Sequence, residues 1–362
     1  MRVALGIVAG TVGGPRSYGL GLVRALAAEF PRDEWFVLTD RPGDFDGIPL
    51  AGVVRVPLPA KVLRPAVEAA LLPRAIRRVA PDVYHGTKHS VPARCPCPRV
   101  ATIHDLAFFA MPRTFPRASG MWLRAEARAA VRRSARIFAP SAHTKGDLVR
   151  FLGADPARVA VVPNGVADAL LRPAAAGEAE RVRRAHGLPE RFVLCLGTVQ
   201  PRKNPDVLLE AYASLGVPGV GLVFAGRRGW MAGPFLKSLA RTPGARLLEG
   251  VPDGDLPGLL AAAEVFASPS SYEGFGLSVA EAMAAGLPVV AGDSSSVPEV
   301  TGEAAVLVSP RDGAALRAAL RRLLGDPAER RRLGEAARRR AARFTWAAAA
   351  RAVRAVYEEA SA

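Results

Sequence analysis

Short, continuously apolar segments recur along the chain and alternate with longer stretches in which apolar and polar residues follow a helical period. Uninterrupted apolar runs are typical of parallel strands covered on both faces, and the helical stretches between them supply the cover. We predict strands at residues 2–9, 35–39, 53–56, 82–87, 99–103, 137–140, 159–162, 192–196, 221–225, 246–248, 265–267, 287–291 and 305–308. This alternation predicts an α/β chain with two doubly wound, Rossmann-like domains facing each other across a cleft.

The stretch from residue 265 to residue 291 is the most informative part of the pattern. An apolar run is followed by a loop rich in Pro, Ser and Gly, and then by a helix-favouring segment at 277–285 that ends at Gly286. Ligands of open parallel sheets bind beyond the carboxyl ends of the strands, where residues 272–276 fall. Because this loop also opens a helix, its N–H groups favour an anion.

Two glutamates flank this loop. Glu273 stands at its mouth, and Glu281 follows eight positions later inside the predicted helix. Carboxylates so placed can hold hydroxyl groups at two ends of one ligand, and Gly274 and Gly276 let the backbone come close to it. The alternative is a solvated Glu273 and a Glu281 on the wet face of the helix.

A second Gly-rich loop, at residues 11–19, connects the first strand to a helix predicted at 20–30. Strand, Gly13-Gly14 and helix N-terminus again form an anion-binding arrangement, although a tight turn would also explain the two glycines. The loop has neither the spacing of a dinucleotide fingerprint nor that of a Walker A loop.

Polar residues follow two further strands of the first half. His104 and Asp105 lie at the carboxyl end of the strand at 99–103, where Asp105 can orient the imidazole. The alternative is that Asp105 caps the next turn and His104 is merely packed. His85 lies near Lys88 and His89, so it is either an acceptor contact or a loop histidine without a role.

Arg202 and Lys203 lie on a loop between the strand at 192–196 and a helix at 206–214. An arginine fork and a lysine point charge at a helix N-terminus suit a diphosphate. In isolation, such a pair on a surface loop is usually solvated.

Several of these motifs together resemble one family. Glu-Gly-Phe-Gly at 273–276, Glu281 and Ala-Met-Ala-Ala-Gly-Leu-Pro-Val-Val at 282–290 are similar to the donor-site signature of glycosyltransferase family 4. His-Asp-Leu-Ala-Phe-Phe from 104 resembles the acceptor-side motif of that family. The resemblance is dense from 193 to 310 and looser from 2 to 166. It implies the GT-B architecture and a retaining, nucleotide-sugar-dependent enzyme of the mannosyltransferase-like group.

The resemblance also implies roles for individual residues. Glu273 would contact the transferred sugar, Glu281 the ribose, and the backbone at Val251 the nucleobase. Arg202 and Lys203 would hold the phosphates and stabilise the charge of the departing nucleoside diphosphate. The donor-binding set is Gly13, Gly14, Gly197, Arg202, Lys203, Gly226, Val251, Glu273, Gly274, Phe275, Gly276, Leu277 and Glu281. The acceptor set is Tyr18, His85, His104 and Asp105, and the catalytic set is His104, Arg202, Lys203 and Glu273.

The length of 362 residues suits two domains. We expect an acceptor-side domain at 1–168 and a donor-binding domain at 169–346, with residues 347–362 crossing back onto the first. No Asp-x-Asp metal motif lies in a suitable loop, so no metal or other cofactor is expected. Cys95, Cys97 and Cys195 are too few and too badly spaced for a disulfide framework, which favours a reducing cytoplasm.

The formal charge of +16 comes almost wholly from arginine. A genomic bias toward arginine is one explanation for part of this charge, and an anionic membrane surface, a nucleic acid and an anionic substrate are the alternatives. The stretches 61–79 and 121–137 alternate basic and apolar residues, as interfacial helices and ordinary surface helices both do. Nucleic-acid-binding motifs are absent from the sequence, and no apolar run reaches 18 residues. We therefore expect a cytoplasmic protein with possible peripheral contact to an anionic membrane.

The resemblance to this family implies transfer of a hexosyl unit, with mannosyl as the first choice, from a nucleotide sugar to a hydroxyl of a sugar or glycolipid. Synthesis of a surface polysaccharide or glycolipid is the expected setting. A nucleotide-sugar epimerase of the same architecture is an alternative within enzymes. A non-catalytic sugar- or lipid-binding protein on this scaffold is the alternative from another class.

Overall fold

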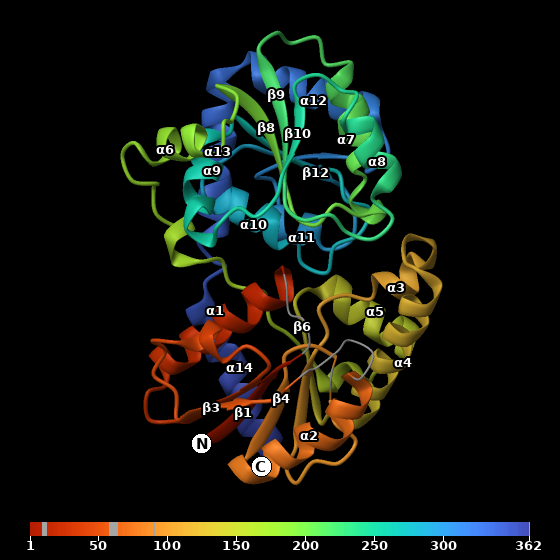
Figure 1. Cartoon of the computed structure of the whole chain (residues 1–362), viewed down its shortest axis with the longest axis vertical. Helices are drawn as coiled ribbons and strands as arrows, with labels where there is room; N and C mark the ends of the chain where they lie inside the picture. The colour runs from red at the N-terminus through yellow and green to blue at the C-terminus, as the bar shows by residue number, and fades with distance from the viewer. Residues whose placement is uncertain (9–12, 58–63, 90, 362) are drawn as a thin grey trace. The chain divides into compact units, whose positions relative to one another are not determined.

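The computed structural model describes residues 1–8, 13–57, 64–89 and 91–361. Within it the chain forms two compact units (Figure 1). Unit 1 comprises Met1–Ala110, Ala118–Gly165 and Thr345–Ala362, and unit 2 comprises Met111–Arg117 and Val166–Phe344. Each unit contains one parallel sheet and its covering helices, as the alternating pattern predicts.

The sheet of unit 1 has seven parallel strands in the order β3-β2-β1-β4-β5-β6-β7. Their bounds are β1 Arg2–Ile7, β2 Glu34–Thr39, β3 Gly52–Arg55, β4 Val83–Gly86, β5 Arg99–Thr102, β6 Arg136–Ala139 and β7 Val159–Val161. Strand β1, in the interior of the sheet, pairs with both β2 and β4, so that Val3 lies opposite Trp35 on one side and Val83 on the other.

Helices cover both faces of this sheet. They are α1 Gly14–Glu29, α2 Arg64–Val79, α3 Ala107–Ala110, α4 Arg117–Arg133, α5 Ala142–Leu152 and α14 Trp346–Ser361. Odd residues of β1, such as Leu5, share a buried cluster with α1 and α14, whereas Ala4 packs with Leu72 and Ile76 of α2. Both faces of β1 are therefore shielded from solvent, which is why its sequence is continuously apolar.

Some predicted bounds in unit 1 are wrong by several residues. Helix α1 begins at Gly14, so much of the loop expected at 11–19 is helical, while residues 11 and 12 lie outside the described part. Pro15 near the helix start fits this earlier beginning, since proline is favoured in a first helical turn. Helix α4 ends at Arg133, and residues 136–137 of the expected basic helix belong to β6.

The sheet of unit 2 has six parallel strands in the order β10-β9-β8-β11-β12-β13. They are β8 Arg191–Leu196, β9 Val220–Ala225, β10 Ala245–Leu248, β11 Val265–Ser268, β12 Val289–Gly292 and β13 Val306–Val308. The helices are α6 Glu178–Ala185, α7 Pro205–Ala213, α8 Gly233–Leu239, α9 Leu256–Ala262, α10 Leu277–Ala284, α11 Val297–Thr301, α12 Gly313–Gly325 and α13 Pro327–Ala341.

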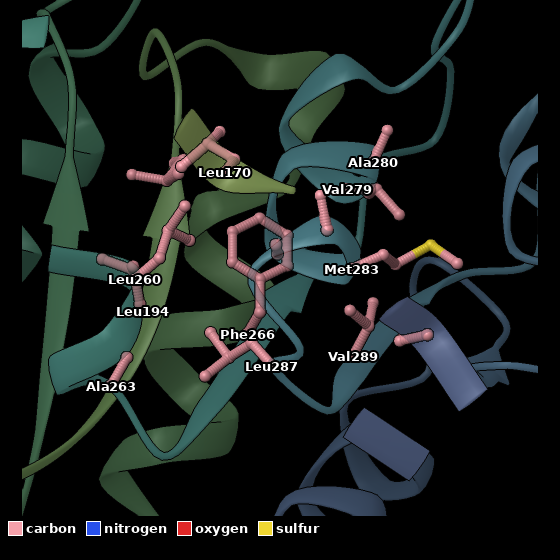
Figure 2. Close-up of a cluster of buried hydrophobic side chains, with 14 of the residues drawn as sticks. Leu170, Leu194, Leu260, Ala263, Phe266, Val279, Ala280, Met283, Leu287 and Val289 are labelled. Atoms are coloured by element: carbon pink, nitrogen blue, oxygen red, sulfur yellow. The ribbon is translucent and has the colours of Figure 1, made fainter. Parts of the chain in front are cut away.

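Phe266 of β11 lies at the centre of the core on one face of this sheet. Its ring is fully buried among side chains that include Leu194, Leu260, Met283 and Val289 (Figure 2). Truncation of such a ring to alanine costs about 3–5 kcal/mol of folding free energy. Because β11 and α10 both anchor in this cluster, the loop that connects them starts and ends on rigid elements.

Each sheet has one point at which the strand order reverses. In unit 1 it lies between β1 and β4, and in unit 2 between β8 and β11. Loops that leave the carboxyl ends of two such strands diverge and leave room for a ligand. Among the described residues, no helix combines the length and the apolar character needed to cross a bilayer.

Candidate active site

The functional residues predicted in unit 2 follow the strands around its switch point. Arg202 and Lys203 lie on a 3₁₀ turn, Pro201–Lys203, after β8, and Glu273 lies in the loop after β11. Gly197, Gly226 and Val251 come directly after or shortly after β8, β9 and β10. The structure thus gathers the predicted donor residues of unit 2 at one edge of the sheet.

Glu273 is the centre of a buried charge cluster. Its carboxylate accepts from Lys203 Nζ at 2.9 Å and from Ser270 Oγ at 2.8 Å, and it lies 3.2 Å from Arg202 Nη1. Burial by itself would raise the pKa of this carboxyl, but the charges of Lys203 and Arg202 and the two hydrogen bonds outweigh it and lower the pKa to about 2. Glu273 is therefore ionised at every pH at which the protein is expected to work.

The two cations of the cluster differ in how many of their donors the protein uses. Arg202 Nη1 also donates to the Tyr272 carbonyl, and Nε and Nη2 face the Gln200 carboxamide oxygen at 3.2 and 3.0 Å. Lys203 Nζ carries three protons and, among the residues that the structure describes, donates one of them to Glu273. Arg202 thus fixes the loop that carries Glu273, while Lys203 has donors to offer an anion.

Backbone geometry holds the cluster in place. Asn204 adopts a left-handed conformation with φ of 47°, and its side-chain amide donates to the Pro269 carbonyl at 2.8 Å and to Ser271 Oγ at 2.7 Å. Gly226 packs so closely on Gly197 that a Cβ atom there would lie 2.2 Å from the Gly197 carbonyl oxygen. The turn after β8 is therefore tied to its neighbours on both sides of the strand.

The loop at 273–276 is held by hydrogen bonds to the Glu273 backbone and by the buried ring of Phe275. The Glu273 N–H donates to Ser295 Oγ at 2.8 Å, and its carbonyl accepts from Ser296 Oγ at 2.9 Å. Phe275 turns into the core, where its ring meets Phe344 edge to face at 5.4 Å. Gly276, with φ of 88°, is the N-cap of α10, and Leu277 is the first residue of the helix. The helix start is thus formed by a residue that tolerates positive φ without strain.

Glu281 lies half-buried on α10. Burial and the nearby Asp253 raise the pKa of this carboxyl to about 7, against the opposing charge of Lys203. Within residues 1–8, 13–57, 64–89 and 91–361, no protein donor hydrogen-bonds to it. A carboxyl that is desolvated without a partner in the protein is suited to accept hydroxyl groups from a ligand.

In unit 1, His104 follows β5 at the edge where the predicted acceptor residues were expected. Its Nε2 donates to the Thr87 carbonyl at 2.8 Å, and Tyr18 meets its ring edge to face at 4.8 Å. Burial lowers its pKa to about 4, although Thr87 and Asp105 oppose that change. The imidazole is therefore neutral at pH 7, with Nδ1 as its acceptor nitrogen.

Asp105 does not orient His104 by a hydrogen bond. Its carboxylate accepts from the Ala107 backbone N–H at 3.0 Å and so caps the short helix α3. The carbonyl of Thr87 takes the role that was expected of Asp105. Asp105 therefore caps the next turn, which is the alternative interpretation that the sequence leaves open for it.

His85 and Tyr18 are interior residues, which rules against the direct acceptor contacts expected of them. His85 is fully buried, with Nδ1 2.6 Å from Tyr357 Oη and Nε2 2.7 Å from Thr102 Oγ1. The same Thr102 hydroxyl bonds to Tyr18 Oη at 2.9 Å. Burial lowers the pKa of His85 to about 3, so it is neutral. Tyr357, Thr102 and Thr87 are site-supporting residues that no sequence motif indicates.

Gly13 and Gly14 begin α1 after β1. Gly13 has φ of 73° and accepts at its carbonyl from the Arg16 and Ser17 N–H groups. Both glycines are exposed, and a Cβ atom at Gly14 would meet no described part of the chain within 4 Å. Arg16 forms a bidentate ion pair with Asp44 at 3.0 Å, which anchors the first turn. The start of α1 is therefore open to an anion and firmly held.

Comparison with protein families gives two matches that together cover most of the chain. A family described as Glycosyltransferase Family 4 matches residues 12–170, and one described as Glycosyl transferases group 1 matches residues 178–340. The division between the two matches falls near the expected domain boundary.

Among curated relatives, O-antigen chain mannosyltransferase B of Escherichia coli is 30% identical over 279 residues, which are 75% of this chain and 73% of that one. The MMP alpha-(1->4)-mannosyltransferase of Mycolicibacterium hassiacum is 37% identical over 227 residues, or 61% of this chain. A D-inositol 3-phosphate glycosyltransferase of Corynebacterium diphtheriae is 35% identical over 229 residues, or 59% of this chain. The chain spans about half of the latter two, 53% and 54%.

Solved structures share the fold over nearly the whole chain. A sucrose-phosphate synthase from Thermosynechococcus elongatus superposes with a TM-score of 0.81 at 22% identity, covering 99% of this chain and 98% of that one. HepE of Anabaena, in complex with UDP and glucose, superposes with a TM-score of 0.79 at 18% identity, covering 99% of both chains. At these identities the likeness concerns the fold.

Proposed function

Because this chain belongs to glycosyltransferase family 4, we propose that it moves a hexosyl unit from a nucleotide sugar to a hydroxyl acceptor, with retention at the anomeric carbon. We assign the donor to unit 2 and the acceptor to unit 1. The observation that carries this proposal is the cluster of Arg202, Lys203 and Glu273 at the switch point of unit 2. Two cationic side chains held beside an ionised carboxylate suit a ligand that has both a diphosphate and hydroxyl groups.

In the proposed mechanism, Lys203 binds the donor diphosphate with the protons that Glu273 leaves unused, and Arg202 adds its charge while holding the Tyr272–Glu273 backbone. Both cations are in place before reaction, so they stabilise negative charge on the departing nucleoside diphosphate without rearranging. Glu273 accepts hydroxyl groups of the transferred sugar. The Gly13-Gly14 start of α1 contacts the diphosphate, and Glu281 accepts the ribose hydroxyls.

We assign His104 to hydroxyl recognition rather than to proton removal. An imidazole with a pKa of about 4 is a weak base at neutral pH. Its Nε2–H is held by Thr87, so Nδ1 accepts from a hydroxyl of the sugar or of the acceptor. The acceptor proton then passes to an oxygen of the departing phosphate, whose basicity rises as the sugar–phosphate bond breaks.

A mannosyl donor is our first choice, supported by two relatives named mannosyltransferases. The relative named for O-antigen chains supports a role in surface polysaccharide synthesis. No observation favours the epimerase or the non-catalytic binding protein.

Peripheral contact with an anionic membrane at the cytoplasmic face is a further part of the proposal. Helix α4 exposes Met121, whose exposed fraction is 69%, and it carries the exposed Arg128 and Arg132. An apolar tip beside arginines suits lipid headgroups. Co-sedimentation with phosphatidylglycerol vesicles, but not phosphatidylcholine vesicles, is the expected result, and Met121→Asp should weaken it.

Thermal unfolding with UDP, GDP, ADP and TDP, each with and without magnesium, tests the donor site. A ligand that binds the folded state raises the midpoint with the logarithm of its excess over Kd. We expect one nucleotide to stabilise the protein and magnesium to leave that shift unchanged. Stabilisation by none of the four would contradict the nucleotide-sugar assignment.

A further inference from the structure

The connection between β4 and β5 brings together two cysteines that the glycosyl-transfer mechanism does not use. Cys95 Sγ and Cys97 Sγ lie 3.5 Å apart, with the exposed Pro96 between them. Both thiols are free and half-buried. A disulfide needs the sulfurs at about 2.0 Å, so a shift of about 1.5 Å within one loop would join them.

Hydrogen bonds hold this part of the connection closed. Arg99 Nη1 donates to the carbonyls of Pro92 and Ala93 at 3.2 and 2.9 Å, so the guanidinium spans the segment that contains both cysteines. Arg133 Nη1 donates to the Val91 carbonyl at 3.0 Å. These hydrogen bonds fix the chain on the N-terminal side of the two cysteines and tie it to Arg99 on their C-terminal side.

We propose that Cys95 and Cys97 form a reversible dithiol–disulfide pair that exchanges with low-molecular-weight disulfides. The proposal does not depend on the proposed function, because it needs neither donor nor acceptor.

The two thiols have unequal environments, which gives each a separate part in the exchange. A hydrogen bond from the Cys97 thiol lowers the pKa of Cys95 to about 7, assisted by the charge of Arg99, and the same hydrogen bond raises the pKa of Cys97. Cys195 is the contrast, since burial raises its pKa to about 11. Cys95 is thus the thiol that is ionised near neutral pH, and thiolates are the attacking species.

The exchange balances in two steps. The Cys95 thiolate attacks one sulfur of a disulfide such as glutathione disulfide, forms a mixed disulfide and releases one glutathione thiolate. Cys97 then loses its proton and attacks Cys95 Sγ, which forms the Cys95–Cys97 disulfide and releases the second glutathione. Two electrons pass from the pair to the glutathione disulfide, and glutathione in excess reverses both steps.

The cysteine pair shares its connection with a residue that contacts His104. The connection that contains the pair also supplies the Thr87 carbonyl, which accepts from His104 Nε2. Closing the disulfide moves the two sulfurs about 1.5 Å closer together within this connection. The pair and the Thr87 carbonyl thus belong to the same connection between β4 and β5.

The test is to incubate the full-length protein with glutathione disulfide and to follow its intact mass and its free thiols. We expect the mass to fall by two hydrogens, the thiol count to fall from three to one, and both changes to reverse with dithiothreitol. In Cys97→Ser, the reaction should stop at one covalently bound glutathione on Cys95. Iodoacetamide labelling of Cys95 in Cys195→Ala should be half-maximal near pH 7.

Matched variants distinguish a reaction of the Cys95–Cys97 pair from a nonspecific reaction of any thiol in the protein. Cys195→Ala should react as the wild type does, and Cys95→Ser should lose at least nine-tenths of the reaction rate. The proposal is overturned if the wild type keeps three thiols, or if it accumulates only bound glutathione without closing the disulfide. Equal reaction rates for Cys95→Ser and the wild type would overturn it as well.

Discussion

The candidate functional residues of unit 1 and those of unit 2 handle buried polar groups in opposite ways. In unit 2, Glu273 is kept ionised by two cations. In unit 1, His104 and His85 are kept neutral by burial, and their ring nitrogens bond to uncharged oxygens. The contrast matches the ligands proposed for each unit. A diphosphate is stabilised by positively charged groups that are already in position. A neutral hydroxyl is bound by oriented hydrogen-bond donors and acceptors that carry no charge.

The largest effect is expected from substitution of Lys203, because its ammonium group has N–H donors that Glu273 does not use. Lys203→Ala should lower turnover roughly 10²–10³-fold, because it removes preorganised charge from the leaving group. Glu273 keeps Arg202 and Ser270 as partners, so the protein should stay folded. Donor turnover and thermal unfolding are the two measurements. The exposed Lys237→Ala is the matched control and should behave as the wild type, and normal turnover in Lys203→Ala would exclude Lys203 from the mechanism.

The charge of Glu273 should also appear in the acid stability of the protein. Its pKa is held at about 2, below the unfolded value of 4.5, so its contribution is present above pH 4.5 and is lost as the pH falls from there toward 2. The two values correspond to about 3 kcal/mol of folding free energy. Urea unfolding of the wild type and Glu273→Gln should differ most near pH 7 and converge near pH 2. A difference that does not change with pH would mean that the charge cluster contributes nothing through ionisation.

Glu281 differs from both the ionised Glu273 and the neutral His104. Its pKa of about 7 means that the carboxyl changes charge near neutral pH. Glu281→Ala should weaken nucleotide binding by about 1–3 kcal/mol, the cost of unpairing ribose hydroxyls. Since the ionised carboxylate accepts both hydroxyls, affinity of the wild type should fall about tenfold from pH 8 to pH 6. Calorimetry at several pH values measures both effects. Glu281→Gln supplies the control profile, which includes titration of the nucleotide phosphate, and identical profiles would refute the ribose role.

The smallest effect concerns what keeps His104 neutral. Tyr18→Phe removes the hydroxyl bonded to Thr102 but keeps the ring against His104, so it should cost only about 1 kcal/mol of stability. Because burial dominates, the pKa of His104 should stay near 4 in this variant and rise in Tyr18→Ala. The chain has five histidines, which makes titration by NMR of the imidazole protons practical. A raised pKa in Tyr18→Phe would show that the hydrogen-bond network sets it instead.

Prediction from the sequence succeeded where the signal was local. The strands at 99–103 and 265–267 are apolar runs in the chain itself, and both are found within a residue or two of the predicted bounds. The turns that follow such strands are set by nearby Gly, Pro and Asn residues. In a parallel sheet their positions at the carboxyl edge follow from strand order, which explains why the predicted donor residues of unit 2 lie together at that edge.

Prediction failed where partners are distant in sequence. His85 looks like a loop histidine, but its partner Tyr357 comes from α14, 272 positions away, and together they make His85 an interior residue. Asp105 stands next to His104 in sequence, yet adjacent side chains at the end of a strand diverge, so Asp105 caps α3 instead.

The sequence by itself determined the two-sheet α/β organisation, the family and the residue types at the edge of each sheet, because these depend on local periodicity and contiguous motifs. Only the tertiary structure decided which of these groups are charged, which are neutral and which are hidden. Ionisation and access depend on burial and on partners that lie far along the chain, such as Lys203 for Glu273 and Tyr357 for His85. Packing supplies both, and no short stretch of sequence encodes them.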